Sequence, residues 1–159
     1  MKTRNGFVSN SSSSSFIVIG EAPTDAEVAV YRGRYGNRDV LSITADLGCH
    51  EFGWENTKYT HFWDRVMFSF IQADYVQKEH PEWKKMLNKV LKKRLKVKGI
   101  IWGISTKWKY TPKNTVPAYI DHQSASTEGN NVRMFYTEKE LVNFLFSFGS
   151  YIQGGNDNK

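Results

Sequence analysis

The sequence predicts an α+β fold (or an α/β fold) in a single domain of 159 residues. Short runs of β-branched and aromatic residues alternate along the chain with longer segments whose apolar residues have helical spacing. A hydrophobic content of 40% is sufficient for a buried core, and no linker-like stretch divides residues 1–159. We therefore expect one mixed sheet of about five to six short strands, covered by about three helices.

The chain opens with a serine-rich leader, residues 1–15, that runs into the first predicted strand. Residues 16–19 are a continuous apolar run ended by Gly20, which is typical of a buried strand. Serine is unfavourable inside helices, so the run before this strand favours extended or turn structure. It is either a flexible leader or an ordered segment, anchored by Phe7 and Val8, that offers hydroxyl groups to a polar partner. We predict the ordered form, with the candidate residues Ser11, Ser12, Ser13, Ser14 and Ser15.

Four segments, which reach both ends of the sequence, resemble stretches of other proteins. They are RNGFVSNSSSSSFIV at 4–18, EFGW at 51–54, YIDHQS at 119–124 and FLFSFGSYIQGGNDN at 144–158. In these segments the chain resembles a group of small uncharacterised proteins from bacteriophages and bacteria. The resemblance implies a phage or prophage origin and supplies no catalytic residue. It draws attention to Asn156 and Asp157, which lie in the expected polar tail, residues 154–159.

Residues 27–44 have two interpretations. Thr24 and Glu27 have the spacing of a helix capping box, which favours a short helix. Two β-rich runs with a Gly-Asn turn signal between them favour a hairpin instead. We predict the hairpin, followed by a loop and a short strand at 51–54.

Two helices are expected in the middle of the chain. Residues 56–77 lack Pro and Gly and are apolar over most of a helical circumference, which predicts a buried central helix with Trp63 in the core. A second helix begins at His80-Pro81, and its apolar stripe includes Leu91. The opposite face of this helix carries Lys84, Lys85, Lys89, Lys92, Lys93 and Lys96.

The last third of the chain returns to strand signals. Residues 100–104 are the second strong strand candidate, and we expect them in one sheet with residues 16–19. Thr137 and Glu140 have capping-box spacing and predict a helix that Gly149 closes. Shorter strands are expected at 118–120, 132–136 and 151–152.

Composition limits the function classes. A net charge of +6 permits acidic partners such as nucleic acid without requiring them. The single cysteine, Cys49, excludes an internal disulfide framework and fits a reducing compartment, so we expect a cytoplasmic protein. The resemblance implies that this cytoplasm is that of a bacterial host. No segment approaches the roughly 18 apolar residues of a membrane helix, so no membrane partner is expected. No nucleotide-binding, zinc-finger or hydrolase motif occurs; we expect no cofactor and no metal, and nothing indicates an oligomeric state.

The lysine-rich helix face is the first candidate site. Trp108 and Tyr110 lie among further lysines just after residues 100–104, and interleaved cations and aromatics suit single-stranded nucleic acid. Lysine predominates, and arginine is the better reader of bases, so we expect binding without sequence specificity. An acidic protein surface is an equal alternative, and a solvated face is the most common explanation of such a helix.

Two pairs of polar residues form the second candidate site. His50-Glu51 and Asp121-His122 both follow predicted strands, where sites in α/β sheets often lie. If the loops converge, two carboxylates and two imidazoles would suit a metal or acid–base chemistry. Neighbours on a strand point to opposite faces, so each pair would offer one ligand. Polar groups that cap turns are the ordinary alternative.

The leading hypothesis is a phage-type accessory protein that acts as a binding module on a host protein or nucleic acid. Host takeover or counter-defence would fit the implied origin by analogy. The first alternative is a metal-dependent or acid–base hydrolase of phosphoesters that uses the two polar pairs. The second is a virion or assembly component, for which the serine-rich leader would be a docking tail.

Overall fold

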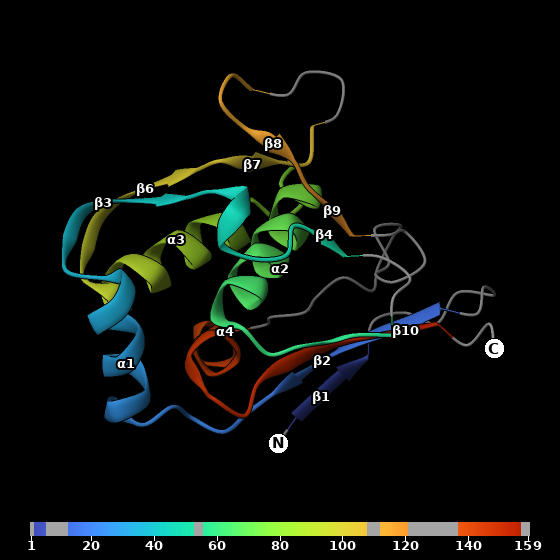
Figure 1. Ribbon diagram of the computed structural model, residues 1–159, viewed down its shortest axis with the longest axis horizontal. Coiled ribbons are helices and arrows are strands. Elements are labelled where there is room, and N and C mark those ends of the chain that lie inside the picture. The colour runs from blue at the N-terminus through green and yellow to red at the C-terminus, as the bar shows by residue number, and fades with distance from the viewer. Residues whose placement is uncertain (1, 6–12, 53–55, 108–111, 121–136, 157–159) are drawn as a thin grey trace.

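The computed structural model describes residues 2–5, 13–52, 56–107, 112–120 and 137–156, which form one domain of the predicted α+β class. Three helices lie in the middle of the molecule: α2 (Phe62–Tyr75), α3 (Pro81–Leu95) and α4 (Glu138–Phe146). Figure 1 shows an antiparallel sheet on one side of these helices and a ribbon of short parallel strands on the other. A fourth helix, α1 (Asp25–Tyr35), packs against α3 and α4.

The antiparallel sheet joins the two ends of the described chain. Its strand order is β1 (Lys2–Asn5), β2 (Ser13–Ile19), β10 (Tyr151–Asn156) and β5 (Lys58–Tyr59). Residues 13–15 of the serine run pair with residues 154–156, which had been expected in a polar tail. Two segments that carry the resemblance are therefore neighbouring strands. Ser11, Ser12, Phe7, Val8 and Asp157 lie outside the described residues.

The ribbon consists of three parallel ladders in succession. Its strands are β3 (Arg38–Ile43) with β6 (Val97–Trp102), β7 (Ile104–Ser105) with β8 (Val116–Pro117), and β4 (Glu51–Phe52) with β9 (Tyr119–Ile120). Gly103 joins the first two ladders, because its N–H donates to the Ile43 carbonyl at 2.7 Å and its carbonyl accepts from Val116 N–H at 2.8 Å. A short 3-10 helix, Ala45–Leu47, separates β3 from β4.

The expectation that residues 16–19 and 100–104 share one sheet is wrong. The first run belongs to β2 in the antiparallel sheet, and the second is divided between β6 and β7 in the ribbon. Nor is the second run buried throughout, since Ile104 is buried whereas Ile101 is 59% exposed. An apolar run identifies a strand but does not specify its partner strand. For the same reason the strands do not join into one mixed sheet.

The predicted hairpin over residues 27–44 is also wrong, because its first half is the helix α1. Thr24 and Glu27 form the complete capping box: Thr24 Oγ1 accepts from Glu27 N–H at 3.2 Å, and Glu27 Oε2 accepts from Thr24 N–H at 2.7 Å. The helix buries Val28 and stacks Tyr31 on Phe62 of α2, with ring centroids 4.4 Å apart. Capping and tertiary packing outweigh the weak β preference of this segment.

The Gly-Asn pair that suggested a hairpin turn instead ends α1. A Cβ atom at Gly36 would lie 2.0 Å from the carbonyl oxygen of Leu95, and Asn37 N–H donates to the same oxygen at 2.9 Å. Asn37 and Lys96 both have left-handed backbone, with φ of 56° and 53°. The exits of α1 and α3 therefore pack backbone against backbone, and this contact requires glycine at position 36.

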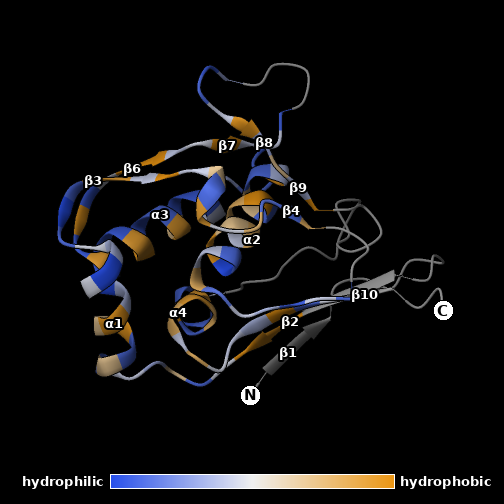
Figure 2. Cartoon of the chain, in the orientation of Figure 1, coloured by the Kyte–Doolittle hydropathy of each residue, from blue (hydrophilic) through white to orange (hydrophobic). Residues whose placement is uncertain are grey.

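The two helices predicted in the middle of the chain are present, but the first begins at Phe62 rather than at residue 56, because Lys58–Tyr59 form strand β5. Trp63 is 2% exposed and Leu91 is completely buried, in a core shared by all four helices and both strand layers. Figure 2 shows α3 alternating between hydrophobic and hydrophilic residues along its length, as amphipathic helices do. No helix in the described ranges is long and apolar enough to cross a membrane.

The last helix begins as predicted and ends earlier. Thr137 Oγ1 accepts from Glu140 N–H at 3.1 Å at the start of α4. The helix stops at Phe146 with Ser147 as its C-cap, so Gly149 is not the closing residue. The strands expected at 118–120 and 151–152 are present as β9 and β10. The strand expected at 132–136 lies outside the described residues.

Candidate functional site

Helix α3 presents lysines on its outer side. Its apolar residues Trp83, Leu87, Leu91 and Leu95 are buried in the core, which leaves the opposite side to solvent. Four exposed lysines on that side, together with Asn88, line an open hollow of about 570 Å³. We call these four the α3 lysine face: Lys85, Lys89, Lys92 and Lys93.

Two lysines of the predicted set do not line this hollow. Lys84 Nζ lies 2.7 Å from Asp74 Oδ1 and 4.8 Å from the ring centroid of Phe70, so this lysine is held against α2. Lys96 is exposed at the C-cap of α3, where its left-handed backbone ends the helix. Trp108, the aromatic residue proposed beside the lysines, lies outside the described residues.

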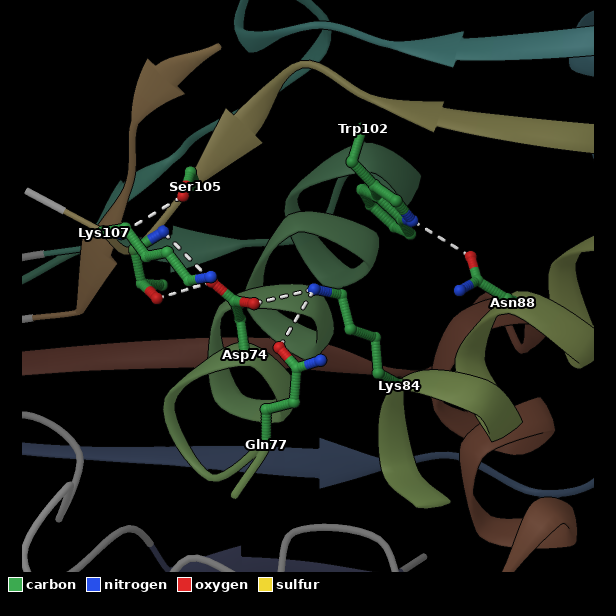
Figure 3. A network of polar contacts seen from close by, with 8 residues as sticks. Asp74, Gln77, Lys84, Asn88, Trp102, Ser105 and Lys107 are labelled. Atoms are coloured by element: carbon green, nitrogen blue, oxygen red, sulfur yellow. Dashed lines mark hydrogen bonds and ion pairs between the residues drawn. The ribbon is translucent and has the colours of Figure 1, made fainter. Parts of the chain in front are cut away.

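Asp74 connects three elements through Lys84 and Thr106 (Figure 3). The side chain of Asp74 is 4% exposed and accepts from Lys84 Nζ at the start of α3. Its Oδ2 accepts from Thr106 N–H at 3.1 Å and from Thr106 Oγ1 at 2.5 Å. Burial opposes ionisation, but the hydrogen bonds from Lys84 and Thr106 outweigh it and lower the pKa of Asp74. The carboxylate therefore fixes α2, α3 and the segment after β7 relative to one another.

Asn88 links the hollow to the ribbon. Its Oδ1 accepts a hydrogen bond from Trp102 Nε1 at 3.0 Å (Figure 3). The Trp102 ring stacks on Phe70 with centroids 4.2 Å apart. The hydrogen bond from Trp102 sets the amide orientation, so Nδ2 is the group that Asn88 can offer to a ligand in the hollow. The lining of the hollow thus includes one amide side chain whose position is fixed by a hydrogen bond.

Helix α4 meets the α3 lysine face through a carboxylate. Glu138 Oε2 lies 2.9 Å from Lys89 Nζ. The hydrogen bond from Lys89 lowers the pKa of Glu138, and the charges of Lys93 and Arg94 act in the same direction. Glu138 also lines a second hollow of about 320 Å³, which we call the α4 hollow. Its lining residues are Ala22, Pro23, Arg94, Glu138, Lys139, Val142 and Asn143.

The second candidate site is only partly described. The β4–β9 ladder places Glu51 opposite Tyr119, and Tyr119 N–H donates to the His50 carbonyl at 3.0 Å. Glu51 belongs to this two-residue parallel ladder, and His50 precedes it. Asp121 and His122 themselves lie outside the described residues. In the ranges that are described, no group of three or more His, Cys, Asp or Glu residues is arranged to hold a metal ion.

A buried arginine is the polar feature that the sequence interpretation missed. Arg65 is completely buried in α2, and its Nη1 donates to the carbonyls of Ser147 and Ser150 at 2.5 and 3.1 Å. Its Nη2 donates to Tyr31 Oη at 2.9 Å. Burial lowers the pKa of Arg65, and the contact with Tyr31 opposes this shift. The available signal was a cation in a helix that is apolar over most of its circumference, and the geometry indicates a structural role in holding the turn after α4.

Of the predicted site residues, the structure therefore groups Lys85, Lys89, Lys92 and Lys93 around one hollow. It ties Lys84 to Asp74 instead, and it adds Asn88 and Glu138, which the sequence interpretation did not include. Comparison with known proteins gives no family assignment: no family model, curated protein or solved structure matches the chain.

Proposed function

We propose that the protein is a binding module whose α3 lysine face holds the phosphates of single-stranded nucleic acid without sequence specificity. The observation that supports this function is the gathering of four exposed lysines around one open hollow. Phosphate binding by lysine releases counterions from the nucleic acid, which supplies affinity without reading bases. The open shape suits a flexible strand that lies across the surface.

The residue types support binding without base recognition. Lysine is a compact point charge on a flexible stem, whereas base edges are read mainly by the planar fork of arginine and by amides. Asn88 is the amide in the hollow, and its oxygen already accepts from Trp102. The α3 lysine face therefore supports phosphate contacts, which position a strand and carry no sequence information directly.

The biological setting follows from the proposed activity and from the resemblance. We propose a phage-type accessory protein of the bacterial cytoplasm, acting in host takeover or counter-defence. The second candidate partner is an acidic host protein, because an exposed lysine-lined helix also complements carboxylates. The following experiment distinguishes a nucleic-acid partner from an acidic protein partner, because it uses a nucleic-acid probe and measures how its binding depends on salt.

The test is binding of a fluorescent oligothymidylate of about 12 nucleotides, measured by anisotropy over a salt series. Lys85→Gln with Lys92→Gln should weaken binding and reduce the slope of log affinity against log salt by about 1.4, since each single-strand phosphate contact contributes about 0.7. Lys89 is left unchanged because it is paired with Glu138. The matched control is Lys78→Gln with Lys113→Gln, which removes the same charge from exposed lysines that line neither hollow.

Equal weakening by both double variants would show that net charge, rather than the α3 lysine face, drives binding. Absence of any binding to single-stranded DNA or RNA at low salt would overturn the nucleic-acid proposal. A lysate pull-down with the wild-type protein and the Lys85/Lys92 variant would then test the acidic protein partner.

A further inference from the structure

The carboxylate of Glu138 links the hollow of the α3 lysine face to the α4 hollow. The side chain of Glu138 is 37% exposed and its partner Lys89 is 66% exposed, so both groups are accessible to a ligand. Glu138 lines the α4 hollow, whereas Lys89 lines the hollow of the α3 lysine face. The ion pair therefore joins the two hollows at their shared border.

The α4 hollow also has the character of a phosphate-binding surface. Arg94 and Lys139 supply cations to its lining, and Pro23 and Val142 supply apolar surface. Arg94 follows Lys93 directly, so the cations continue from the first hollow into the second without a break in the helix. From Lys85 to Arg94 the axis of α3 rises about 14 Å, at about 1.5 Å per residue, which is enough for more than one phosphate of an extended strand.

We infer that the nucleic-acid surface continues past Glu138 into the α4 hollow, and that Glu138 is an internal competitor whose place on Lys89 is taken by a phosphate of the bound strand. This inference rests on the proposed function and adds to it the extent of the site and a residue that limits its affinity. In the free protein the carboxylate neutralises Lys89 and reduces the positive potential of Lys93 and Arg94. A phosphate that binds Lys89 must first displace it.

A structural tie between α3 and α4 is the competing explanation of this ion pair. Exposed pairs of this kind contribute little to stability, about 0–1 kcal/mol. Helix α4 is also held by its buried residues Leu141, Phe144, Leu145 and Phe146. The fold therefore does not depend on Glu138, and its position on the basic surface has a consequence for binding instead.

The test measures the affinity of oligothymidylate of about 12 nucleotides for wild type, Glu138→Gln, Lys89→Gln and the double variant. Glu138→Gln should raise the affinity about two- to fivefold at low salt, the range that an exposed ion pair is worth. In the Lys89→Gln background the same change should have a clearly smaller effect, because the cation that Glu138 occupies is gone. Glu79→Gln, in the exposed turn between α2 and α3, makes the same charge change away from both hollows and should have a smaller effect than Glu138→Gln.

Lys139→Gln tests the extension into the α4 hollow. It should weaken binding of the 12-nucleotide probe more than it weakens binding of a dinucleotide, which is too short to cover both hollows. Equal effects on the two probes would confine the site to the first hollow and overturn the extension.

The two proposals fail in different ways. If wild type binds through Lys85 and Lys92 but Glu138→Gln leaves the affinity unchanged, the competitor role is wrong and the proposed function stands. If Glu138→Gln has the same effect with and without Lys89, or no more effect than Glu79→Gln, the carboxylate acts through general charge and the competitor role is again wrong. If wild type binds no single strand at low salt, both proposals are overturned.

Discussion

Arg65 and Ser147 form a buried contact between α2 and the end of α4: Nη1 of the arginine donates to the serine carbonyl oxygen at 2.5 Å. The same guanidinium also holds Ser150 and Tyr31. Replacing Arg65 with Met should lower the free energy of unfolding by about 2–5 kcal/mol, because buried acceptors lose a charged donor. Arg65→Lys should lower the free energy of unfolding by less, since lysine keeps the positive charge but lacks the planar guanidinium with its several donors. Urea unfolding of both variants checks this order, and wild-type stability of Arg65→Met would contradict it.

Replacement of Gln72 by an apolar residue should raise the stability of the protein, in contrast to replacement of Arg65. Gln72 is 1% exposed in α2, and neither Oε1 nor Nε2 has a hydrogen-bond partner in the structure. Gln72→Met keeps the shape and removes two unsatisfied polar atoms, so it should raise the unfolding free energy by about 1–2 kcal/mol. Gln72→Glu is the matched contrast and should destabilise strongly, because it buries an unpaired charge. A loss of stability in Gln72→Met would show that the amide is satisfied in solution.

The two glycines near the end of α1 should respond differently to replacement by alanine. Gly36→Ala should cost about 1–3 kcal/mol, because its Cβ would lie 2.0 Å from the Leu95 carbonyl oxygen. Gly33→Ala has nothing within 4 Å of the added atom and sits inside the helix, so it should stabilise by about 0.4–1 kcal/mol. Thermal unfolding of the two variants provides the measurement. If Gly33→Ala destabilised the protein, α1 would not be helical in solution.

Asp74 should make the protein sensitive to acid. Its pKa is lowered in the folded state, so its contribution to stability is present above its ordinary value of 3.8 and is lost as pH falls through the lower folded value. Asp74→Asn should cost about 1–3 kcal/mol near neutral pH and should lose less stability than wild type below about pH 4. Denaturant unfolding across that range gives the comparison. Parallel pH profiles for the two proteins would mean that Asp74 makes no such contribution.

The serine run should be protected in solution. Residues 13–15 lie in β2, where their backbone pairs with residues 154–156 of β10. Amide exchange in these residues should therefore be slowed relative to an unstructured chain, even with no partner added. Exchange at the unstructured rate would return the run to the flexible leader that the sequence also allowed.

Local patterns in the sequence were sufficient for part of the fold. The 3.6-residue periodicity of residues 81–95 located α3 and placed Lys85, Lys89 and Lys92 on one side, because helix spacing is a local property. The same periodicity could not reveal that Lys84 is drawn to Asp74, since that contact depends on how α2 and α3 pack. Glu138 was missed for a similar reason, as 49 positions separate it from Lys89.

Strand pairing was the least predictable part. The run at 16–19 and the run at 100–104 have similar composition, but the first pairs with β1 and with the distant β10, whereas the second pairs with β3 and β8. A strand's own residues do not specify which edge it will join. The helix α1 shows the converse, because its capping box was visible in the sequence and a generic turn signal was given more weight.

The pairing of β2 with β10 has a consequence for the order of events during synthesis. The helices and the β1–β2 ladder close within neighbouring parts of the sequence, whereas β2 must wait for the last described strand before its second edge is filled. Pairing between strands that are distant in sequence slows folding, because the entropy of closing the loop is lost before the stabilising contacts form. Until β10 has left the ribosome, the antiparallel sheet that contains Ile17 and Ile19 is incomplete. During this period a chaperone would protect these two residues, which are buried in the folded protein, most effectively.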